Sequence, residues 1–368
     1  MDFSFSHEQE QFRDSLARFL RDKSPTSAVR KLMATDRGYD PAVWRQLCDD
    51  LGVAGLHLPE DVGGSGYGPV ELGIALEEQG RALLCAPYLA SAVMAGYAVL
   101  LGGTEAQRAE LLPGIAGGTT IATLAVTESE GLWRAGDVRL AATASGDGFR
   151  LNGRKRFVVD GQNADLLVVA GRTGKGVSLF AVDAAAEGVS RRAVPPMDPT
   201  RKLAEIVFDD APSRLLGAEG EAPLEAILDA VLVAFAHEMI GGAQALLDSA
   251  VAYAKLRVQF GRPIGSFQAI KHRCADLLVQ VELAKAAVYQ AAQLLADGED
   301  ATVAASQAKA VAAEAYMHAA RECIQFHGGI GFTWENDTHL WFKRAKSSEV
   351  FLGAPREHRE RMLQAMGV

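Results

Sequence analysis

Hydrophobic and polar residues follow a helical period in the first third of the chain. Ser6 and Gln9 have the spacing of a capping box, which marks a helix start. Behind this cap, apolar residues recur at helical spacing: Phe12, Leu16, Phe19 and Leu20. Further helices are predicted from Pro41 to Leu51, over 70–80, and over 90–101 and 105–116. The N-terminal third is therefore expected to be helical.

From about residue 119 to residue 216 the pattern changes to short alternating or β-branched runs. Gly, Asn and Asp separate these runs, as turns require. Six of them are predicted as strands: 121–126, 149–151, 156–159, 166–169, 178–182 and 205–208. A small β-domain of six or more strands follows from this pattern.

After Pro223 the helical period returns and continues to the end of the chain. One stripe holds Leu224, Leu228, Val231, Phe235 and Met239, and the next holds Leu277, Val281, Ala284, Val288 and Leu295. A third helix is predicted over 301–326. Long striped helices with short loops favour an antiparallel four-helix bundle. The expected fold is α+β, with a helical domain at 1–118, a β-barrel or sandwich at 119–218, and a helical bundle at 219–368.

Composition narrows the choice of partners. The chain has 368 residues and a net charge of −9, which argues against nucleic acid or an anionic membrane as the main partner. Its four cysteines are scattered and are expected to be reduced, buried thiols. The first residues lack the features of a signal peptide, and the longest apolar stretch, 226–236, is interrupted by Asp229. A cytoplasmic protein without a metal-ligand cluster is expected.

Four local motifs occur in order along nearly the whole chain. They are GLHLPEDVGGSG at 55–66, LNGRKRFVV at 151–159, RVQFGRPI at 257–264 and QFHGGIGF at 325–332. Together with the order of helices and strands, these motifs resemble the acyl-CoA dehydrogenase family. The resemblance implies FAD as cofactor and the desaturation of acyl-CoA thioesters as the reaction.

In that family two subunits share each FAD, and the resemblance implies which residues of this chain reach the FAD of a neighbour. Arg257 matches the arginine that pairs with the diphosphate, a role suited to a guanidinium fork. The remaining matches are Phe260, Gln268, Gln325, Gly328 and Gly329. Two glycines in a row allow the backbone to approach a bulky ligand closely. An alternative is that Arg257 and Gln325 only bridge helices within the bundle.

The half of the site that would hold the chain's own flavin departs from the family. Thr127 matches, but Trp133 stands where an ungapped reading places the serine that binds phosphate. Phe157 replaces the tryptophan that stacks on the flavin, and Val159 replaces a threonine. These changes together predict a weakened or absent flavin site on this chain.

The catalytic base is also missing. Desaturation needs a carboxylate to remove the α-proton while hydride leaves the β-carbon for the flavin. The two family positions for that carboxylate correspond here to Leu352 and, by ungapped count, Val231. Asp229 and Glu238 are the nearest acids on the same helix and are weak candidates for a relocated base. Paired or solvated acids are the commoner explanation.

Three hypotheses are consistent with these residues. The first is a base-lacking subunit that completes the FAD site of a homologous catalytic subunit, in an α2β2 assembly that passes electrons to an acceptor protein. Such heteromers resemble bacterial acyl-CoA dehydrogenases of steroid side-chain degradation. The second is a self-associating enzyme with a relocated base, and the third is a non-catalytic acyl-CoA-binding scaffold.

Overall fold

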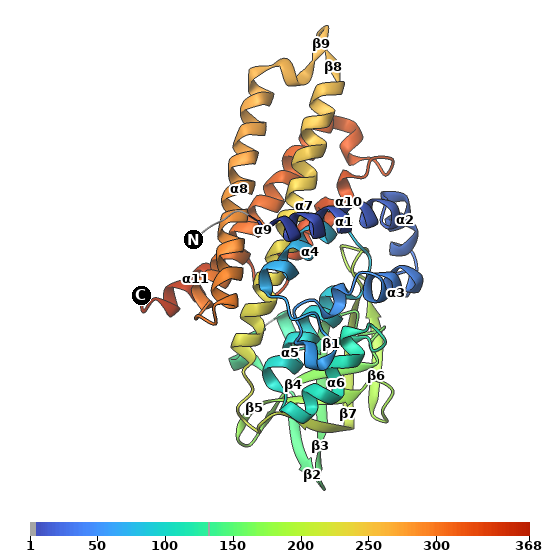
Figure 1. Cartoon of the computed structure of the whole chain (residues 1–368), viewed down its shortest axis with the longest axis vertical. Helices are drawn as coiled ribbons and strands as arrows, with labels where there is room; N and C mark the ends of the chain where they lie inside the picture. Colours follow the sequence, from blue (N-terminus) through green and yellow to red (C-terminus); the bar gives the residue numbers. More distant parts are fainter. Residues whose placement is uncertain (1–4, 132) are drawn as a thin grey trace. The chain divides into compact units, whose positions relative to one another are not determined.

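The structure is a computed structural model that describes residues 5–131 and 133–368. The chain divides into two compact units. The barrel unit comprises Lys31–Leu72 and Cys85–Val231, and the bundle unit comprises Met1–Arg30, Gly73–Leu84 and Leu232–Val368. Figure 1 labels the helices and strands of both. The three-domain division at residues 118 and 218 stays a prediction.

A closed β-sheet forms the centre of the barrel unit. Strand β4 (Leu166–Thr173) pairs with both β2 (Ala141–Ser145) and β5 (Gly176–Asp183), so the order β4-β2-β3-β7-β5 closes on itself. The remaining members of this ring are β3 (Gly148–Val159) and β7 (Leu203–Leu216). Outside the ring, β1 (Ala122–Ala125) runs parallel to β4, and β6 (Val189–Val194) pairs with β7. Buried residues such as Leu151, Phe180, Ile206 and Phe208 fill the interior.

In the barrel unit the predicted strands are present, but two more exist there and two predicted runs merge. Strand β3 contains both predicted runs, 149–151 and 156–159, and the polar stretch between them. The polar stretch belongs to the strand because Lys155 is buried and ion-paired there while its neighbours face outward. Strands β2 and β6 were not predicted. Both have largely exposed side chains, so neither has the apolar alternation that marks a strand.

The helical part of the barrel unit comes from the N-terminal third. It contains α3 (Pro41–Asp49), α5 (Gly96–Gly102), α6 (Glu105–Ala116) and the short helices η1 (Val53–Gly55) and η2 (Glu60–Val62). The helix expected over 90–101 begins instead as a wide π-helical segment, η3 (Leu89–Ala95), and continues as α5. Three helices cross the division between the units: α2 (Thr26–Met33), α4 (Pro69–Arg81) and α7 (Leu224–Leu256).

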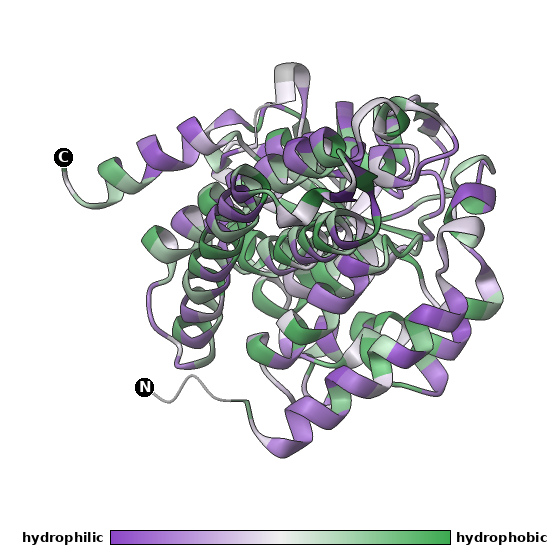
Figure 2. Ribbon diagram, turned by 90° about the horizontal axis from the view of Figure 1, so that it is seen from above, coloured by the Kyte–Doolittle hydropathy of each residue, from purple (hydrophilic) through white to green (hydrophobic). Residues whose placement is uncertain are grey.

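The bundle unit consists of long helices. Its members are α1 (His7–Lys23), α8 (Gln268–Ala296), α9 (Thr302–His327), α10 (Thr338–Val350), α11 (Pro355–Ala365) and most of α7 (Leu224–Leu256). The capping box of Ser6 and Gln9 is confirmed. In Figure 2 green and purple alternate along the helices, as expected for helices with one buried face.

Helix α7 is the most apolar of these elements. Among the described residues it is the one helix long and apolar enough to cross a membrane, with a mean hydropathy of 1.5 in its most apolar window. Because 94% of that window is buried inside the protein, α7 has the pattern of a core helix. Its contact with α4 is very close. A Cβ added at Gly80 or Gly241 would lie 2.0 or 1.9 Å from a carbonyl oxygen of the other helix.

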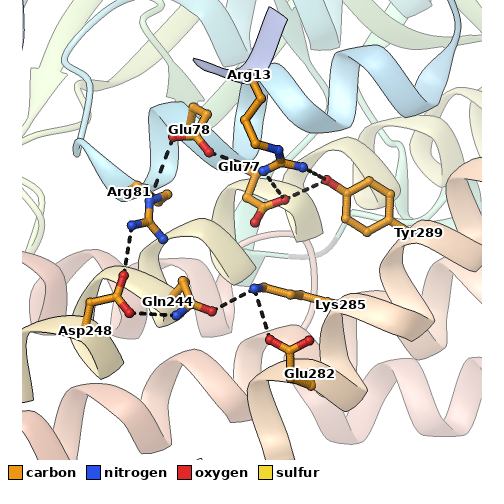
Figure 3. A network of polar contacts seen from close by, with 9 residues as sticks. All are labelled: Arg13, Glu77, Glu78, Arg81, Gln244, Asp248, Glu282, Lys285 and Tyr289. Atoms are coloured by element: carbon orange, nitrogen blue, oxygen red, sulfur yellow. Dashed lines mark hydrogen bonds and ion pairs between the residues drawn. The ribbon is translucent and has the colours of Figure 1, made fainter. Parts of the chain in front are cut away.

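This close crossing brings α4 into a network of charges that also includes α1 and α8, with the buried Glu77 and Glu78 at its centre (Figure 3). Arg13 of α1 lies 3.1 Å from the Glu77 carboxylate and 3.2 Å from that of Glu78. The Tyr289 hydroxyl of α8 donates to Glu77 at 2.6 Å. Burial alone would raise the pKa of Glu77, but Arg13 and Tyr289 outweigh it and hold this pKa below its usual range. The network continues through Arg81, Asp248, Gln244, Lys285 and Glu282.

Replacement of Arg13 tests how much this network stabilises the bundle unit. Arg13→Gln should lower the free energy of unfolding by about 2–4 kcal/mol, because Glu77 and Glu78 lose their shared cation in a buried setting. Urea unfolding followed by circular dichroism measures the change. Arg18→Gln, on an exposed position of the same helix, is the matched control and should change stability by less than about 0.5 kcal/mol. Equal effects of the two substitutions would contradict a stabilising role for the network.

Candidate functional site

The hairpin between α7 and α8 carries two of the predicted site residues. Strands β8 (Val258–Gln259) and β9 (Arg262–Pro263) are joined by Phe260 and Gly261, both with positive φ. Phe260 is 91% exposed, which is unusual for a large aromatic ring on a rigid turn. Arg257 is exposed as well, and its guanidinium has no ion pair with any described residue. The alternative that Arg257 bridges helices within its own bundle therefore finds no support.

The other predicted residues of this group lie at the same end of the bundle unit. Tyr253, one turn before Arg257, stacks on His327 with ring centroids 4.1 Å apart. His327 ends α9 and directly precedes Gly328 and Gly329. Arg273, near the start of α8, pairs with Glu322 of α9 at 3.2 Å. The ends of three helices meet at these contacts, and they carry the exposed side chains of Arg257, Gln268 and Gln325.

The Gly-Gly turn is open on its outer side. Gly328 adopts φ 64° and ψ −140°, a conformation that favours glycine. A Cβ added to Gly328 or to Gly329 would meet no atom within 4 Å. The outward side chains and this bare backbone form a surface that is free to contact a ligand or another subunit.

A second group of predicted residues surrounds the loop after β1 in the barrel unit. The Thr127 carbonyl accepts a hydrogen bond from the Arg156 amide at 2.8 Å, which fixes the loop to β3. The buried Lys155 ammonium donates to Glu128 at 2.7 Å and to the Val126 carbonyl at 2.8 Å. Burial lowers the pKa of Lys155 to about 8, although Glu128 opposes the shift. This ion pair therefore holds the loop in place and is not a free acid or base.

Three positions of this group carry residues other than those expected from the family, and these residues are apolar and mostly buried. Trp133 is 2% exposed, so its indole lies within the protein at the position expected for a phosphate-binding serine. Val159 is 1% exposed, and its carbonyl accepts from Thr123. Phe157 lies in a bulge of β3 with φ 56°, a strained conformation of the kind found at ligand sites. None of these three side chains supplies a hydroxyl group to the loop.

The turn at Leu352 is held from several directions. Leu352 has φ 51° and is 3% exposed, and its carbonyl accepts from His358 Nε2 at 2.8 Å. The Lys309 ammonium donates to the carbonyls of Ser348, Glu349 and Gly353 at 3.0, 3.4 and 3.0 Å. Three acceptors match the three protons of an ammonium group. The turn is therefore rigid and presents a leucine.

The alternative acids on α7 do not supply an unpaired carboxylate in the bundle unit. Glu238 is 7% exposed and accepts from Arg344 Nη1 at 2.7 Å; Arg344 is itself 3% exposed. A carboxylate bound to a buried guanidinium is a weak base, because removal of its charge would leave the cation unpaired. Val231 is fully buried and Asp229 is 5% exposed, both within the barrel unit. Among the described residues no cluster of His, Cys, Asp or Glu could hold a metal ion.

Comparison with known proteins decides the family. Models of the N-terminal, middle and C-terminal domains of acyl-CoA dehydrogenases match residues 6–119, 123–211 and 227–367. The chain belongs to the acyl-CoA dehydrogenase family. It is 36% identical to the acyl-CoA dehydrogenase IpdE2 of Mycobacterium tuberculosis, over 95% of this chain and 94% of that protein.

Two solved structures are also similar to this acyl-CoA dehydrogenase. One is a variant of the Tcur3481–Tcur3483 steroid ACAD, at 31% identity and a TM-score of 0.91, which covers 98% of both chains. The other is the ChsE4–ChsE5 complex from Mycobacterium tuberculosis, at 27% identity and a TM-score of 0.92, which covers 100% of this chain and 99% of that one. The helical N- and C-terminal parts and the middle β-domain expected from the sequence are confirmed.

Family membership implies FAD and chemistry at a CH–CH bond. The two halves of the predicted FAD site fit this cofactor unequally. The outward group at Arg257 fits an anionic, aromatic ligand, because it offers a free cation, an exposed ring and bare backbone. The loop at Thr127 fits less well, because the buried Trp133 and Val159 provide no phosphate-binding hydroxyl.

Sequence reasoning missed the polar residues that hold these loops. Lys309, Arg344 and Lys155 are all buried, and each is fixed by carbonyls or by one carboxylate. A signal for Lys309 exists in the sequence, since it is the single charged residue in the small apolar run from 308 to 313. A lone charge in an apolar run indicates a buried polar contact, but not its partner.

His237, next to Glu238, is a neutral buried imidazole. Its Nδ1–H donates to the Val233 carbonyl at 2.9 Å, and its ring meets Tyr289 edge to face at 4.7 Å. Nε2 is buried and has no hydrogen-bond partner in the described structure. Burial lowers the pKa of His237 to about 4. His237 is therefore not a cationic partner for Glu238.

This shift predicts a pH-dependent stability. Because the fold disfavours the protonated imidazole, the free energy of unfolding is highest above about pH 6.5 and falls progressively as pH drops from 6.5 to about 4. Between pH 7 and pH 5 the wild-type chain should lose about 2 kcal/mol more than His237→Gln, at about 1.4 kcal/mol per pH unit below 6.5. Urea unfolding at both pH values measures the difference. Parallel pH profiles for the two chains would mean that His237 is protonated in the fold.

Proposed function

We propose that this chain is the base-lacking subunit of a heteromeric acyl-CoA dehydrogenase. It would complete the FAD site of a homologous catalytic subunit, in an α2β2 assembly, and take part in α,β-desaturation of an acyl-CoA thioester. The observation that carries the proposal is the rigid turn at Leu352. Its backbone is held by Lys309 and His358, while the side chain has no carboxylate.

Desaturation requires several groups, which this chain and a partner subunit would supply together. FAD, when bound, accepts hydride from the β-carbon, and a carboxylate must take the α-proton at the same time. Leu352 and Val231 have no group that accepts a proton, and Glu238 is held by Arg344. The partner subunit would therefore supply the carboxylate, and Arg257 of this chain would bind the FAD diphosphate. Electrons would then pass from FAD to an acceptor protein.

Two of the similar proteins support a heteromer. The ChsE4–ChsE5 structure is a complex of two differently named chains, and the Tcur3481–Tcur3483 protein is described as a steroid ACAD. Similarity to both over nearly the whole chain favours a paired subunit and a bulky steroid-derived acyl group. A self-sufficient enzyme with Glu238 or Asp229 as base and a non-catalytic acyl-CoA-binding scaffold are the outcomes that the following tests separate from the proposal.

Flavin content is the first test. The chain purified alone should hold much less than one FAD per chain, and the co-purified complex with its homologous partner should hold FAD. In that complex Arg257→Ala should weaken FAD binding about 10- to 100-fold, because a charge-assisted contact to phosphate is removed. Flavin absorbance after gel filtration measures both results.

Arg273→Ala is the matched control for Arg257, because Arg273 pairs with Glu322 of its own bundle. It should leave FAD content unchanged. A full flavin spectrum from the isolated chain would overturn the shared site and favour the self-sufficient enzyme. Normal FAD content in the Arg257→Ala complex would remove Arg257 from the cofactor site.

The base is the second test. The pair Glu238→Gln and Arg344→Met removes the carboxylate together with its buried cation, so that neither charge is left unpaired. Turnover by the complex should stay within a few fold of wild type, as should turnover by Asp229→Asn. A required base contributes about 10²–10⁴-fold. A loss of that size with FAD still bound would make this chain the catalyst.

A further inference from the structure

A histidine without a partner lies inside the helical part of the barrel unit. His57 is 7% exposed, and neither Nδ1 nor Nε2 has a hydrogen-bond partner in the structure from residue 5 to 131 and 133 to 368. Burial lowers the pKa of His57 to about 3, so the ring is neutral. A buried imidazole normally satisfies at least one nitrogen, because an unpaired polar group in the interior is destabilising. The two nitrogens of His57 therefore require an explanation.

A second polar side chain lies beside it. The ring of Tyr97 is 4.5 Å from that of His57, centroid to centroid, and is 6% exposed. Burial raises the pKa of Tyr97, and its hydroxyl forms no hydrogen bond with any described residue. Tyr88, on the same helical segment, differs in this respect. Its hydroxyl donates to the Val53 carbonyl at 2.8 Å.

The backbone beside this pair is unusually shaped. The seven residues of η3 form a π-helix, all of them buried, and such wide turns occur often at functional sites. Gly96 follows η3, and a Cβ added there would lie 3.5 Å from His57 Nε2. The edge of the imidazole that carries Nε2 therefore faces bare backbone. This part of the protein is apolar, but His57 and Tyr97 bring polar atoms into it. Gly96 leaves the backbone beside them without a side chain.

We propose that His57 and Tyr97 form a recognition site for a neutral oxygen, a hydroxyl or keto group, carried by the acyl part of the ligand. A neutral imidazole offers one N–H and one lone pair, and the phenol adds a donor and an acceptor. A hydroxyl can use both kinds of contact, and a keto oxygen can accept from either donor. A carboxylate is disfavoured, because a buried anion requires a charged partner. The inference rests on the proposed function only in taking the ligand to be an acyl thioester.

Ligand binding by the full chain tests this site without turnover or flavin. Isothermal titration would compare octanoyl-CoA with a set of monohydroxy- and keto-octanoyl-CoA isomers. At least one oxygenated isomer should bind the wild-type chain about tenfold more tightly than octanoyl-CoA, given ordinary hydrogen-bond strengths. His57→Phe and Tyr97→Phe should each bring that ratio close to one while leaving affinity for octanoyl-CoA within about twofold.

Stability separates a ligand site from a structural one. His57→Phe removes two unpaired polar atoms and should raise the melting temperature of the ligand-free chain by roughly 2–4 °C. Tyr88→Phe is the matched control; it should lower the melting temperature and leave the ligand ratio unchanged. Three results would overturn the proposal: no preference among the thioesters, no acyl-CoA binding at all, or a preference that survives both substitutions. A lower melting temperature for His57→Phe, with an unchanged affinity ratio between the thioesters, would indicate that the pair binds a buried water molecule and not a ligand. The outcome does not depend on FAD content, which tests the heteromer separately.

Discussion

Charges buried in a protein have to be neutralised nearby, and this requirement determines much of what the chain can do. Glu77 is held by Arg13 and Tyr289, Glu238 by Arg344, and Glu128 by Lys155. Each pair joins segments that are distant in sequence, and loss of one partner would leave the other charge buried and unpaired, which would destabilise the unit. The same pairing makes these carboxylates poor bases. Stability and the absence of an evident base therefore have a common physical origin.

The sequence was sufficient to predict the succession of a helical, a strand-rich and a second helical region, and the family. Long apolar stripes and strong caps, such as the one at Ser6, can be recognised in the local sequence and are present in the structure. Strands β2 and β6 could not be predicted, because their residues face solvent and pairing alone keeps them extended. The π-helical start at Leu89 could not be predicted from the local sequence either, since nothing in its apolar composition distinguishes it from an α-helix.

In the candidate site, too, some features can be predicted from sequence and others cannot. Residues matched through motifs, such as Arg257 and Gly329, can be named from sequence, and the structure shows that they are outward and open. The partners of buried polar side chains cannot be named from sequence. Lys309 meets three carbonyls, whereas His57 meets no partner in the part of the chain that the structure describes. Only three-dimensional packing separates a satisfied polar residue from one that is free to bind a ligand.

The turn at Leu352 also bears on how freely its residue can change during evolution. The left-handed conformation of residue 352 is imposed by contacts to backbone carbonyls of the turn, which Lys309 and His358 supply, and not by the side chain at that position. The loop would therefore keep its shape with a different side chain at this position. The shape of this turn and the chemistry of its side chain are set by different residues, so the side chain can change during evolution while the shape is kept.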